Sequence, residues 1–224
     1  QYIRHEEPFW SKELLRLSHG KFSAEIVPFD RAGVPGQDML RLMQLGVVPL
    51  GNLQLNRIAS QEPEFNAPDL AGLNPDMATL KKNVGAFRLY LEKTLRERYG
   101  IELLTIYVYP AQVVFCKNPL ATMADLAGRR TRVSSATGAD FVEAFGGVPV
   151  LTGFSEIMPN MATGNIECAI TGTMSGNTIG LHEVTTHLHT MTVTWGLSIF
   201  AANSAAWKGM PPELKALLQT ELPK

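Results

Sequence analysis

Residues 131–150 read TRVSSATGADFVEAFGGVPV and contain a strand, a helix and a second strand. The short runs 131–133 and 148–150 are rich in β-branched residues, which favours strands. Between them, 139–145 carries apolar residues at helical spacing and is followed by two glycines. Strands joined through a helix pair in parallel, because the crossover must cover a face of the sheet. This stretch therefore predicts an α/β fold.

The same alternation extends in both directions from this stretch. We expect further strands at 24–27, 47–50, 103–108, 113–116 and 166–170, and helices at 9–17, 37–45, 77–95 and 155–162. Pro110 marks a domain crossing. We therefore expect two α/β lobes. The first is 1–110, joined by the returning segment 201–224, and the second is 111–200.

The composition is that of an ordinary globular chain. Its 224 residues include 45% hydrophobic and 18% charged residues, with a formal net charge of −1. This balance gives no reason to expect nucleic acid or an anionic membrane as a partner. The sequence opens at Gln1 without a signal-peptide pattern, as we expect of a mature or trimmed chain. Cys116 and Cys168 both lie in strand-like runs, and the sequence leaves open whether they pair.

Polar residues gather at three predicted strand ends, and in an open α/β sheet ligands bind beyond the carboxyl ends of strands. The most informative is 132–138, where Arg132 and Ser134 precede a helix. A helix N-terminus and a guanidinium together suit a planar carboxylate. The residues alone leave open that Arg132 is a surface or ion-paired residue and that the serines only cap the helix.

The other two ends carry Asn52 with Gln54, and Thr171 with Thr173. Neither matches a phosphate loop or a dinucleotide fingerprint, so we expect no cofactor. His187 and His189 share a face of a strand, but no paired cysteine or spaced acidic residue completes a zinc site with them. We expect no metal, and no nucleophile motif indicates a catalytic site.

Several motifs, in order, resemble those of TRAP-type (tripartite ATP-independent periplasmic) transporter substrate-binding proteins. They cover about residues 8–215. The motifs are PFDRAG at 28–33, MLRLMQLG at 39–46, LATMADLAGRRTRV at 120–133, FSEI at 154–157 and GNIECAITG at 164–172.

The resemblance implies a two-lobed Venus-flytrap fold, a periplasmic location and a membrane permease pair as partner. It assigns the carboxylate-binding arginine to Arg132 and places further pocket positions on other residues of this chain. These positions are Gln112, Phe154, Thr171, Asn52, Gln54 and Trp195. Gln112 replaces a basic residue of some sialic-acid binders, which argues against that specificity. Trp195 has core packing as an alternative role. The resemblance also implies that a first strand and C-terminal helices of the family lie outside this sequence.

We therefore predict a monomeric solute-binding protein, not an enzyme, that takes a small organic acid between its lobes. Arg132 would neutralise the carboxylate, and Thr171 and Thr173 would bind its polar atoms. The alternatives are a sensor or scavenger without a transporter, a structural lobe, and a hydrolase or lyase that uses His182, His187 and His189.

Overall fold

The structure, a computed structural model, describes residues 6–28 and 31–223. Residues 1–5, Lys224, and Phe29 with Asp30 of the first family motif lie outside the described residues. The α-helices are α1 Leu14–Leu17, α2 Met39–Gln44, α3 Leu55–Ile58, α4 Met77–Tyr99, α5 Ala136–Ala144, α6 Ile157–Thr163, α7 Thr173–Thr178, α8 Ser204–Gly209 and α9 Pro212–Glu221.

The strands are β1 Leu50–Gln54, β2 Ile101–Val108, β3 Gln112–Cys116, β4 Arg130–Val133, β5 Val148–Leu151, β6 Cys168–Gly172, β7 His187–Thr194 and β8 Leu197–Asn203. A π-helical turn, Phe9–Glu13, leads into α1, and 3₁₀ turns lie at Gly36–Asp38, Pro63–Asp69, Met123–Leu126, Phe154–Glu156 and Leu181–Glu183. The alternation of helix and strand predicted from the sequence is therefore confirmed, with shifts of a few residues at the element ends, except for the strand expected at 24–27.

The chain divides into two compact units. Unit 1 contains Gln1–Leu53, Glu92–Tyr107 and Ile199–Lys224, and unit 2 contains Gln54–Leu91 and Val108–Ser198. Helix α4 therefore contributes to both units. Residues 54–91 group with unit 2, whereas the sequence-based division put them in the first lobe. The two-lobe division at Pro110 stays a prediction.

Unit 1 is built on a three-stranded sheet with the order β1-β8-β2. Trp10 stacks on Phe200 with ring centroids 5.1 Å apart, and both belong to a buried cluster that includes Leu14 and Leu218. The strand expected at 24–27 was wrong, since these residues form no strand. The strand expected at 47–50 instead begins at Leu50 and runs to Gln54.

Unit 2 is built on a five-stranded sheet with the order β5-β4-β6-β3-β7. Strand β4 pairs in parallel with both β5 and β6. Strand β3 pairs antiparallel with β6 and with β7. The expected parallel pairing therefore holds for the three strands around β4 and was wrong for β3. The carboxyl ends of β4, β5 and β6 consequently lie at the same end of the sheet.

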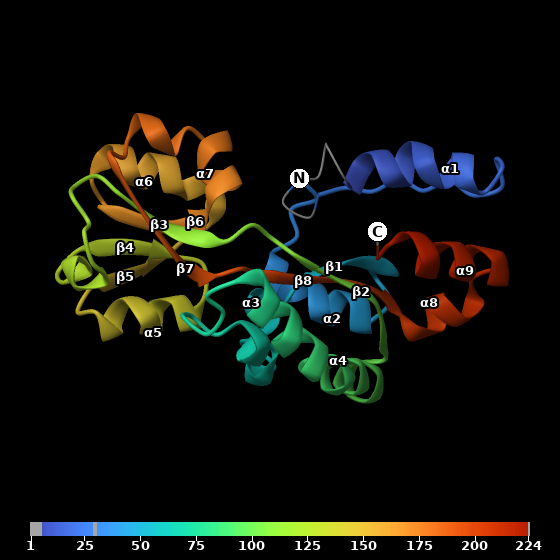
Figure 1. The fold of residues 1–224 in the computed structure, drawn as a ribbon. Coiled ribbons are helices and arrows are strands. Elements are labelled where there is room, and N and C mark those ends of the chain that lie inside the picture. The colour runs from blue at the N-terminus through green and yellow to red at the C-terminus, as the bar shows by residue number, and fades with distance from the viewer. Residues whose placement is uncertain (1–5, 29–30, 224) are drawn as a thin grey trace. The chain divides into compact units, whose positions relative to one another are not determined.

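Helices cover both faces of this sheet. Helix α5 lies on one face and α6 with α7 on the other (Figure 1). Alternate residues of the strands supply the two cores, as a two-residue period requires. Val114 and Ile170 join the cluster that contains Val142 of α5, while Ala169 joins the cluster that contains Met161 of α6. Buried sheet faces on both sides leave the strand ends as the accessible polar part of the sheet.

A disulfide joins Cys116 of β3 to Cys168 of β6. The two residues are directly opposite each other in the antiparallel pair, with Cα atoms 4.1 Å apart. At the other end of the same pair, Gln112 is opposite Gly172. The disulfide therefore fixes the end of the β3–β6 pair that is remote from Gln112.

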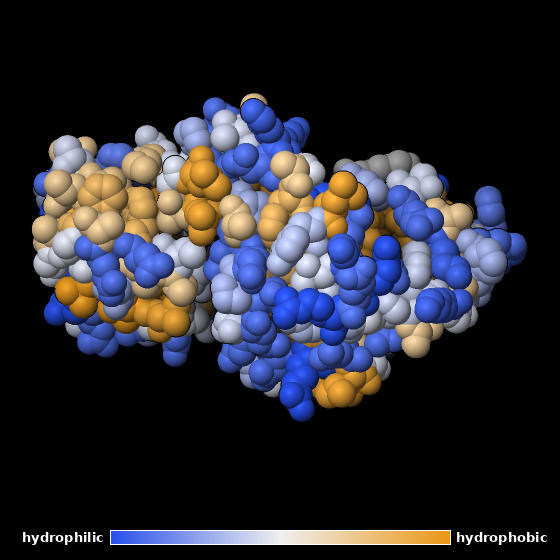
Figure 2. Space-filling view, turned by 90° about the horizontal axis from the view of Figure 1, so that it is seen from below, coloured by the Kyte–Doolittle hydropathy of each residue, from blue (hydrophilic) through white to orange (hydrophobic). Residues whose placement is uncertain are grey.

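Hydrophobic residues also reach the surface at both edges of this sheet. Val148 and Leu151 of β5, and Leu188 and Met191 of β7, are exposed. Figure 2 shows hydrophobic residues grouped on the displayed face of unit 2 among hydrophilic ones. No helix within residues 6–28 and 31–223 has the length and apolar character needed to cross a membrane.

Candidate functional site

Arg132 is buried near the carboxyl end of β4, with 2% of its surface exposed. Its Nε and Nη2 donate to the carbonyl oxygen of Thr152 at 3.1 and 3.0 Å, and its Nη1 donates to the carbonyl oxygen of Ile170 at 3.0 Å. Thr152 directly follows β5 and Ile170 belongs to β6, the two neighbours of β4. The guanidinium therefore links the carboxyl ends of three parallel strands, where open α/β sheets bind ligands.

The charge of Arg132 has no counter-charge in direct contact. Within the part of the chain that the structure describes, no carboxylate forms an ion pair with it. Its three hydrogen bonds leave one N–H on each terminal nitrogen without a described partner. Burial lowers the pKa of Arg132 to about 10, as does the nearby charge of Arg57, while Glu156 opposes both. The group is still a cation at neutral pH, so an incoming anion would supply the missing charge.

The chain turns from strand to helix directly after Arg132. Ser135 has an extended backbone, and its Oγ accepts a hydrogen bond from the backbone N–H of Gly138 at 3.2 Å. Ser135 is thus the N-cap of α5, as one of the two interpretations of these serines predicted. Ser134 is half-buried between Val133 and this cap. Its assignment to ligand binding stays a prediction.

Phe154 lies two residues beyond the carbonyl group that holds Arg132. It opens the 3₁₀ turn Phe154–Glu156, and 39% of its surface is exposed. A large exposed ring two residues from the carbonyl partner of Arg132 suits the apolar part of an acid, and the assignment of Phe154 to the pocket stays a prediction. The hydroxyl of Thr152 in the same segment is buried and makes no hydrogen bond with the described residues. Sequence reasoning did not single out Thr152, because its part in the site depends on its position next to Arg132.

The two threonines of the third strand end differ in exposure. Thr171 is buried in β6, with 3% of its surface exposed. Thr173 is exposed at the start of α7, and its backbone N–H donates to the carbonyl of Ala111 at 3.4 Å. Both follow Ile170, whose carbonyl oxygen accepts from Arg132. Thr173 is therefore the more accessible hydroxyl of the two.

Gln112 and Gln54 both belong to unit 2, and each makes side-chain hydrogen bonds there. The Nε2 of Gln112 donates to the carbonyl of Pro110 at 3.2 Å and is 3.2 Å from the place of a Cβ atom at Gly172. The Nε2 of Gln54 is 3.4 Å from the hydroxyl oxygen of Tyr109. The Oε1 of Gln54 accepts from Nε of Arg57 at 2.5 Å. Gln54 is the N-cap residue of α3, and Arg57 lies three residues later in that helix; sequence reasoning did not single out Arg57.

Trp195 is held by three hydrogen bonds from its own N–H groups. Its backbone N–H donates to both carboxylate oxygens of Asp69, at 3.2 and 3.1 Å, and its indole Nε1 donates to the carbonyl of Asn74 at 3.0 Å. Asp69 also accepts from the backbone N–H of Gly196 at 2.7 Å. Burial raises the pKa of Asp69, while the hydrogen bonds from Gly196, Trp195 and Asn74 oppose this. Trp195 is half-buried, so its position is fixed without its ring being fully covered.

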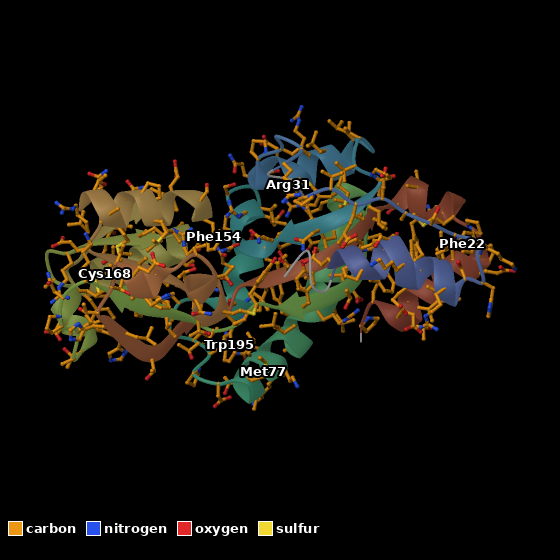
Figure 3. The ribbon with its side chains drawn as sticks, turned by 90° about the horizontal axis from the view of Figure 1, so that it is seen from above. Phe22, Arg31, Met77, Phe154, Cys168 and Trp195 are labelled. Atoms are coloured by element: carbon orange, nitrogen blue, oxygen red, sulfur yellow. A yellow bond between two sulfur atoms is a disulfide. The ribbon has the colours of Figure 1, made fainter. Side chains whose placement is uncertain are left out.

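Asn52 is the one predicted site residue that belongs to unit 1. It lies in β1, and its Oδ1 is buried and accepts no hydrogen bond from the described residues. All other predicted binding residues belong to unit 2. Figure 3 shows Phe154 and Trp195 well away from Cys168, toward the opposite end of that unit.

The histidines are separate from this group. The Nδ1 of His189 accepts from the backbone N–H of Met191 at 3.2 Å, and the Nδ1 of His187 is 2.7 Å from the hydroxyl of Thr186. His182 is exposed in the turn Leu181–Glu183. Within the described ranges, no three His, Cys, Asp or Glu side chains gather as a metal site would require.

One protein family and several solved structures match this chain. The family described as bacterial extracellular solute-binding protein, family 7, matches residues 5–224. An extracytoplasmic solute receptor of Bordetella pertussis that binds pyroglutamic acid has 22% identity and a TM-score of 0.87. The match covers 98% of this chain and 72% of the receptor.

Two further structures carry other acids. A TRAP periplasmic solute-binding protein from Desulfovibrio salexigens with bound orotic acid has 18% identity and a TM-score of 0.83, over 97% of this chain and 70% of that one. One from Sulfitobacter sp. NAS-14.1 with bound β-D-galacturonate has 19% identity and a TM-score of 0.82, over 94% and 71%. At these identities the structures show that the fold is shared.

Proposed function

Because the chain belongs to family 7 of the bacterial extracellular solute-binding proteins, we propose that it captures a small organic acid and that Arg132 binds the acid's carboxylate. The match confirms the resemblance to TRAP-type binding proteins that the sequence motifs indicated. It favours solute binding over a hydrolase or lyase that uses the histidines. On this proposal the protein releases its acid unchanged to the permease of a TRAP transporter.

One observation supports this function above all others: Arg132 is a buried cation that has no carboxylate partner among the residues that the structure describes. A buried charge is costly unless it is paired and hydrogen-bonded. Main-chain carbonyls of Thr152 and Ile170 orient the guanidinium but supply only partial negative charge. A ligand carboxylate would accept from the two remaining N–H groups and add the counter-charge. Such charge-assisted bonds each contribute about 1.5–3 kcal/mol.

The disulfide supports an extracytoplasmic location. Disulfides persist in the periplasm and other oxidising compartments and are rare where thiols are kept reduced. Cys116 and Cys168 are joined in unit 2. The proposed periplasmic location therefore has support from this chain's own chemistry, in addition to the family.

Calorimetry with a panel of organic acids tests the proposal. The panel should include pyroglutamate, orotate, galacturonate, malonate and other carboxylates, with their amides as uncharged analogues. We expect at least one acid to bind and its amide to bind at least about tenfold more weakly, a difference of roughly 1.4 kcal/mol. We also expect that no acid is consumed during the titration.

Two variants assign the binding to one guanidinium. Arg132→Ala should weaken the binding of the acid at least about tenfold. Arg130→Ala is the matched control, because Arg130 lies on the same strand but is exposed. Circular dichroism should show that both variants are folded. Equal affinity in the wild type and Arg132→Ala would remove Arg132 from its role, and a wild type that binds no acid would refute the function.

A further inference from the structure

We propose that a surface groove between the 3₁₀ turn Pro63–Asp69 and helix α4 is a second binding site, and that it takes a small aromatic molecule with one hydrogen-bond donor, such as an indole or a phenol. Occupation of the groove acts on Trp195 through Asn74. All the residues involved belong to unit 2. Binding in the groove is independent of the proposed capture of an organic acid, so either can fail without the other.

The groove has the size and lining of a site for a small ligand. Its volume is about 300 Å³, at the lower end of the range for small-molecule sites. Apolar walls with very few polar groups are typical of such sites. Here the walls are apolar except for one side-chain amide, and the lining residues are Ala67, Pro68, Leu73, Asn83, Ala86 and Phe87. The volume therefore suits one ring system rather than a larger metabolite.

Two aromatic rings of α4 favour an aromatic ligand. Phe87 lines the groove and is half-buried, and its ring centroid is 5.1 Å from that of Tyr90, with the two ring planes tilted by 42°. The ring of Tyr90 extends this aromatic surface into solvent, since 41% of the residue is exposed. Aromatic rings gain from offset or edge-on contact with a further ring, beyond the apolar area that they bury. A rigid planar ligand also loses less conformational entropy on binding than a flexible chain does.

The single polar side chain of the groove offers an acceptor. Nδ2 of Asn74 donates to the carbonyl oxygen of Pro68 at 2.9 Å and to Oδ1 of Asp69 at 3.2 Å, so Oδ1 of Asn74 is left as an acceptor. Nδ2 of Asn83 donates to this oxygen at 2.8 Å, and the bond fixes which way the Asn83 amide faces. Among the described residues, Oδ1 of Asn83 then accepts no hydrogen bond. An N–H or O–H group of a ligand would satisfy this oxygen.

Two of the lining residues, Pro68 and Asn83, hold the side chain of Asn74, which is 1% exposed. The main-chain carbonyl of Asn74 in turn accepts from Nε1 of Trp195 at 3.0 Å. Figure 3 shows Trp195 near Met77, the first residue of α4, in agreement with this bond. Hydrogen bonds in a connected chain polarise one another. A ligand on Asn83 should therefore change the surroundings of the Trp195 indole, although it does not touch that ring.

Calorimetry with two pairs of probes tests the class of ligand. Indole is compared with 1-methylindole, and 4-methylphenol with 4-methylanisole, so that each pair differs by the hydrogen-bond donor. We expect indole and 4-methylphenol to bind saturably with a dissociation constant of about 1 mM or lower, and at least about fivefold more tightly than their methylated partners. In Asn83→Ala the ratio within each pair should fall to within about twofold of one. A wild type that binds neither donor probe, or that binds both members of a pair equally, overturns the inference.

A pair of variants places the probe in the groove. Ala86→Phe fills the groove from α4, and Ala78→Phe adds the same ring about two turns earlier on that helix, outside the lining. Both alanines are exposed, so neither change alters the core. We expect Ala86→Phe to weaken the binding of indole at least about tenfold and Ala78→Phe to change it by less than about twofold. Circular dichroism should show both variants folded, and unchanged binding of indole by a folded Ala86→Phe variant would overturn the inference.

Tryptophan fluorescence tests the link through Asn74. The chain has three tryptophans, so Trp195→Phe identifies which of them responds. With 4-methylphenol, we expect a saturable change in the emission of the wild type, at the dissociation constant that calorimetry gives. The change should be absent in Trp195→Phe, which should still bind the probe within about threefold of the wild type. An emission that does not respond to bound 4-methylphenol, or a response that persists in Trp195→Phe, would overturn the link from the groove to Trp195.

Discussion

The two ends of the five-stranded sheet in unit 2 contrast in how their polar groups are satisfied. At one end, the disulfide Cys116–Cys168 closes the β3–β6 pair and Arg130 lies 3.6 Å from the carboxylate of Glu167. At the other end, Arg132 is buried with carbonyl partners only. Arg130 and Arg132 are two positions apart on one strand, yet within residues 6–28 and 31–223 only Arg130 is paired with a carboxylate. This difference in partners, and not the residue type, is why we propose that the end with Arg132 binds the ligand.

The largest expected effect concerns the disulfide end. The bond connects residues 52 positions apart, and a cross-link of that span stabilises by about 4 kcal/mol through the entropy of the unfolded chain. The double variant Cys116→Ala, Cys168→Ala should lose about that much free energy of unfolding, measured in urea. The affinity for the acid should stay within about threefold of the wild type, because the binding end retains its contacts. A folded double variant with strongly weakened binding would mean that the two ends are coupled.

The predictable part of the fold is the part governed by local periodicity. Helical spacing located α4, with Leu80, Leu91 and Leu95 buried along one face as expected. The failed strand at 24–27 is instructive. Its residues alternate between half-buried and exposed, and Ala24 and Ile26 pack on the core of unit 1, but they form no strand. A two-residue period in burial indicates an extended segment with one side facing a core. A β-strand also needs a neighbouring strand to pair with, and the local sequence does not specify that neighbour.

The candidate site was predictable where it depends on the end of a strand. The position of Arg132 before a helix placed it at the carboxyl edge of the sheet, and this is where it lies. Its partners were not predictable, because Thr152 and Ile170 are 20 and 38 residues away and bind through main-chain atoms. The same holds for Asp69, whose carboxylate binds Trp195 across 126 residues. Long-range backbone contacts leave no side-chain signature in the sequence.

The next effect concerns the carboxylate of Asp69, which holds Trp195 at the end of the sheet remote from the disulfide. Replacing Asp69 with Asn substitutes an amide N–H₂ for one of two oxygens that both accept hydrogen bonds. At least one N–H of Trp195, Gly196 or Asn74 would then face another donor. We expect a loss of about 1–3 kcal/mol in the free energy of unfolding at pH 5. Asp69→Asn with wild-type stability would contradict this account of how Trp195 is held.

The pH dependence of this loss has a definite sign. Burial raises the pKa of Asp69 in the folded protein above its ordinary 3.8. The folded state therefore binds the proton more tightly than the unfolded state does. The stabilisation that the folded protein gains from this raised pKa of Asp69 is fully present below pH 3.8. It is lost as the pH rises through the raised pKa. The difference in stability between wild type and Asp69→Asn should shrink as the pH rises across this window, as urea unfolding at a series of pH values would measure.

A smaller effect is expected at the N-cap of α5. Ser135→Ala removes the acceptor of the Gly138 N–H, and such caps contribute about 1 kcal/mol. Ser135→Asp restores an acceptor and should recover most of the lost free energy of unfolding. If both variants lose stability equally, the hydroxyl of Ser135 serves something other than the cap.

The smallest effect is expected for Arg130, and it sharpens the contrast with Arg132. Its side chain is 50% exposed and that of Glu167 is 33% exposed, so water screens the pair. Arg130→Ala should change the free energy of unfolding by about 0–1 kcal/mol, and 1 M salt should reduce even this difference. Its Nη2 also donates to the carbonyl of Gly164, which solvent can satisfy once the side chain is removed. The affinity for the acid should be unchanged, because the counter-charge of Arg130 is already part of the protein. An Arg130→Ala variant that lost binding as Arg132→Ala does would show that the positive charge of the whole strand, and not an unpaired buried cation, attracts the ligand.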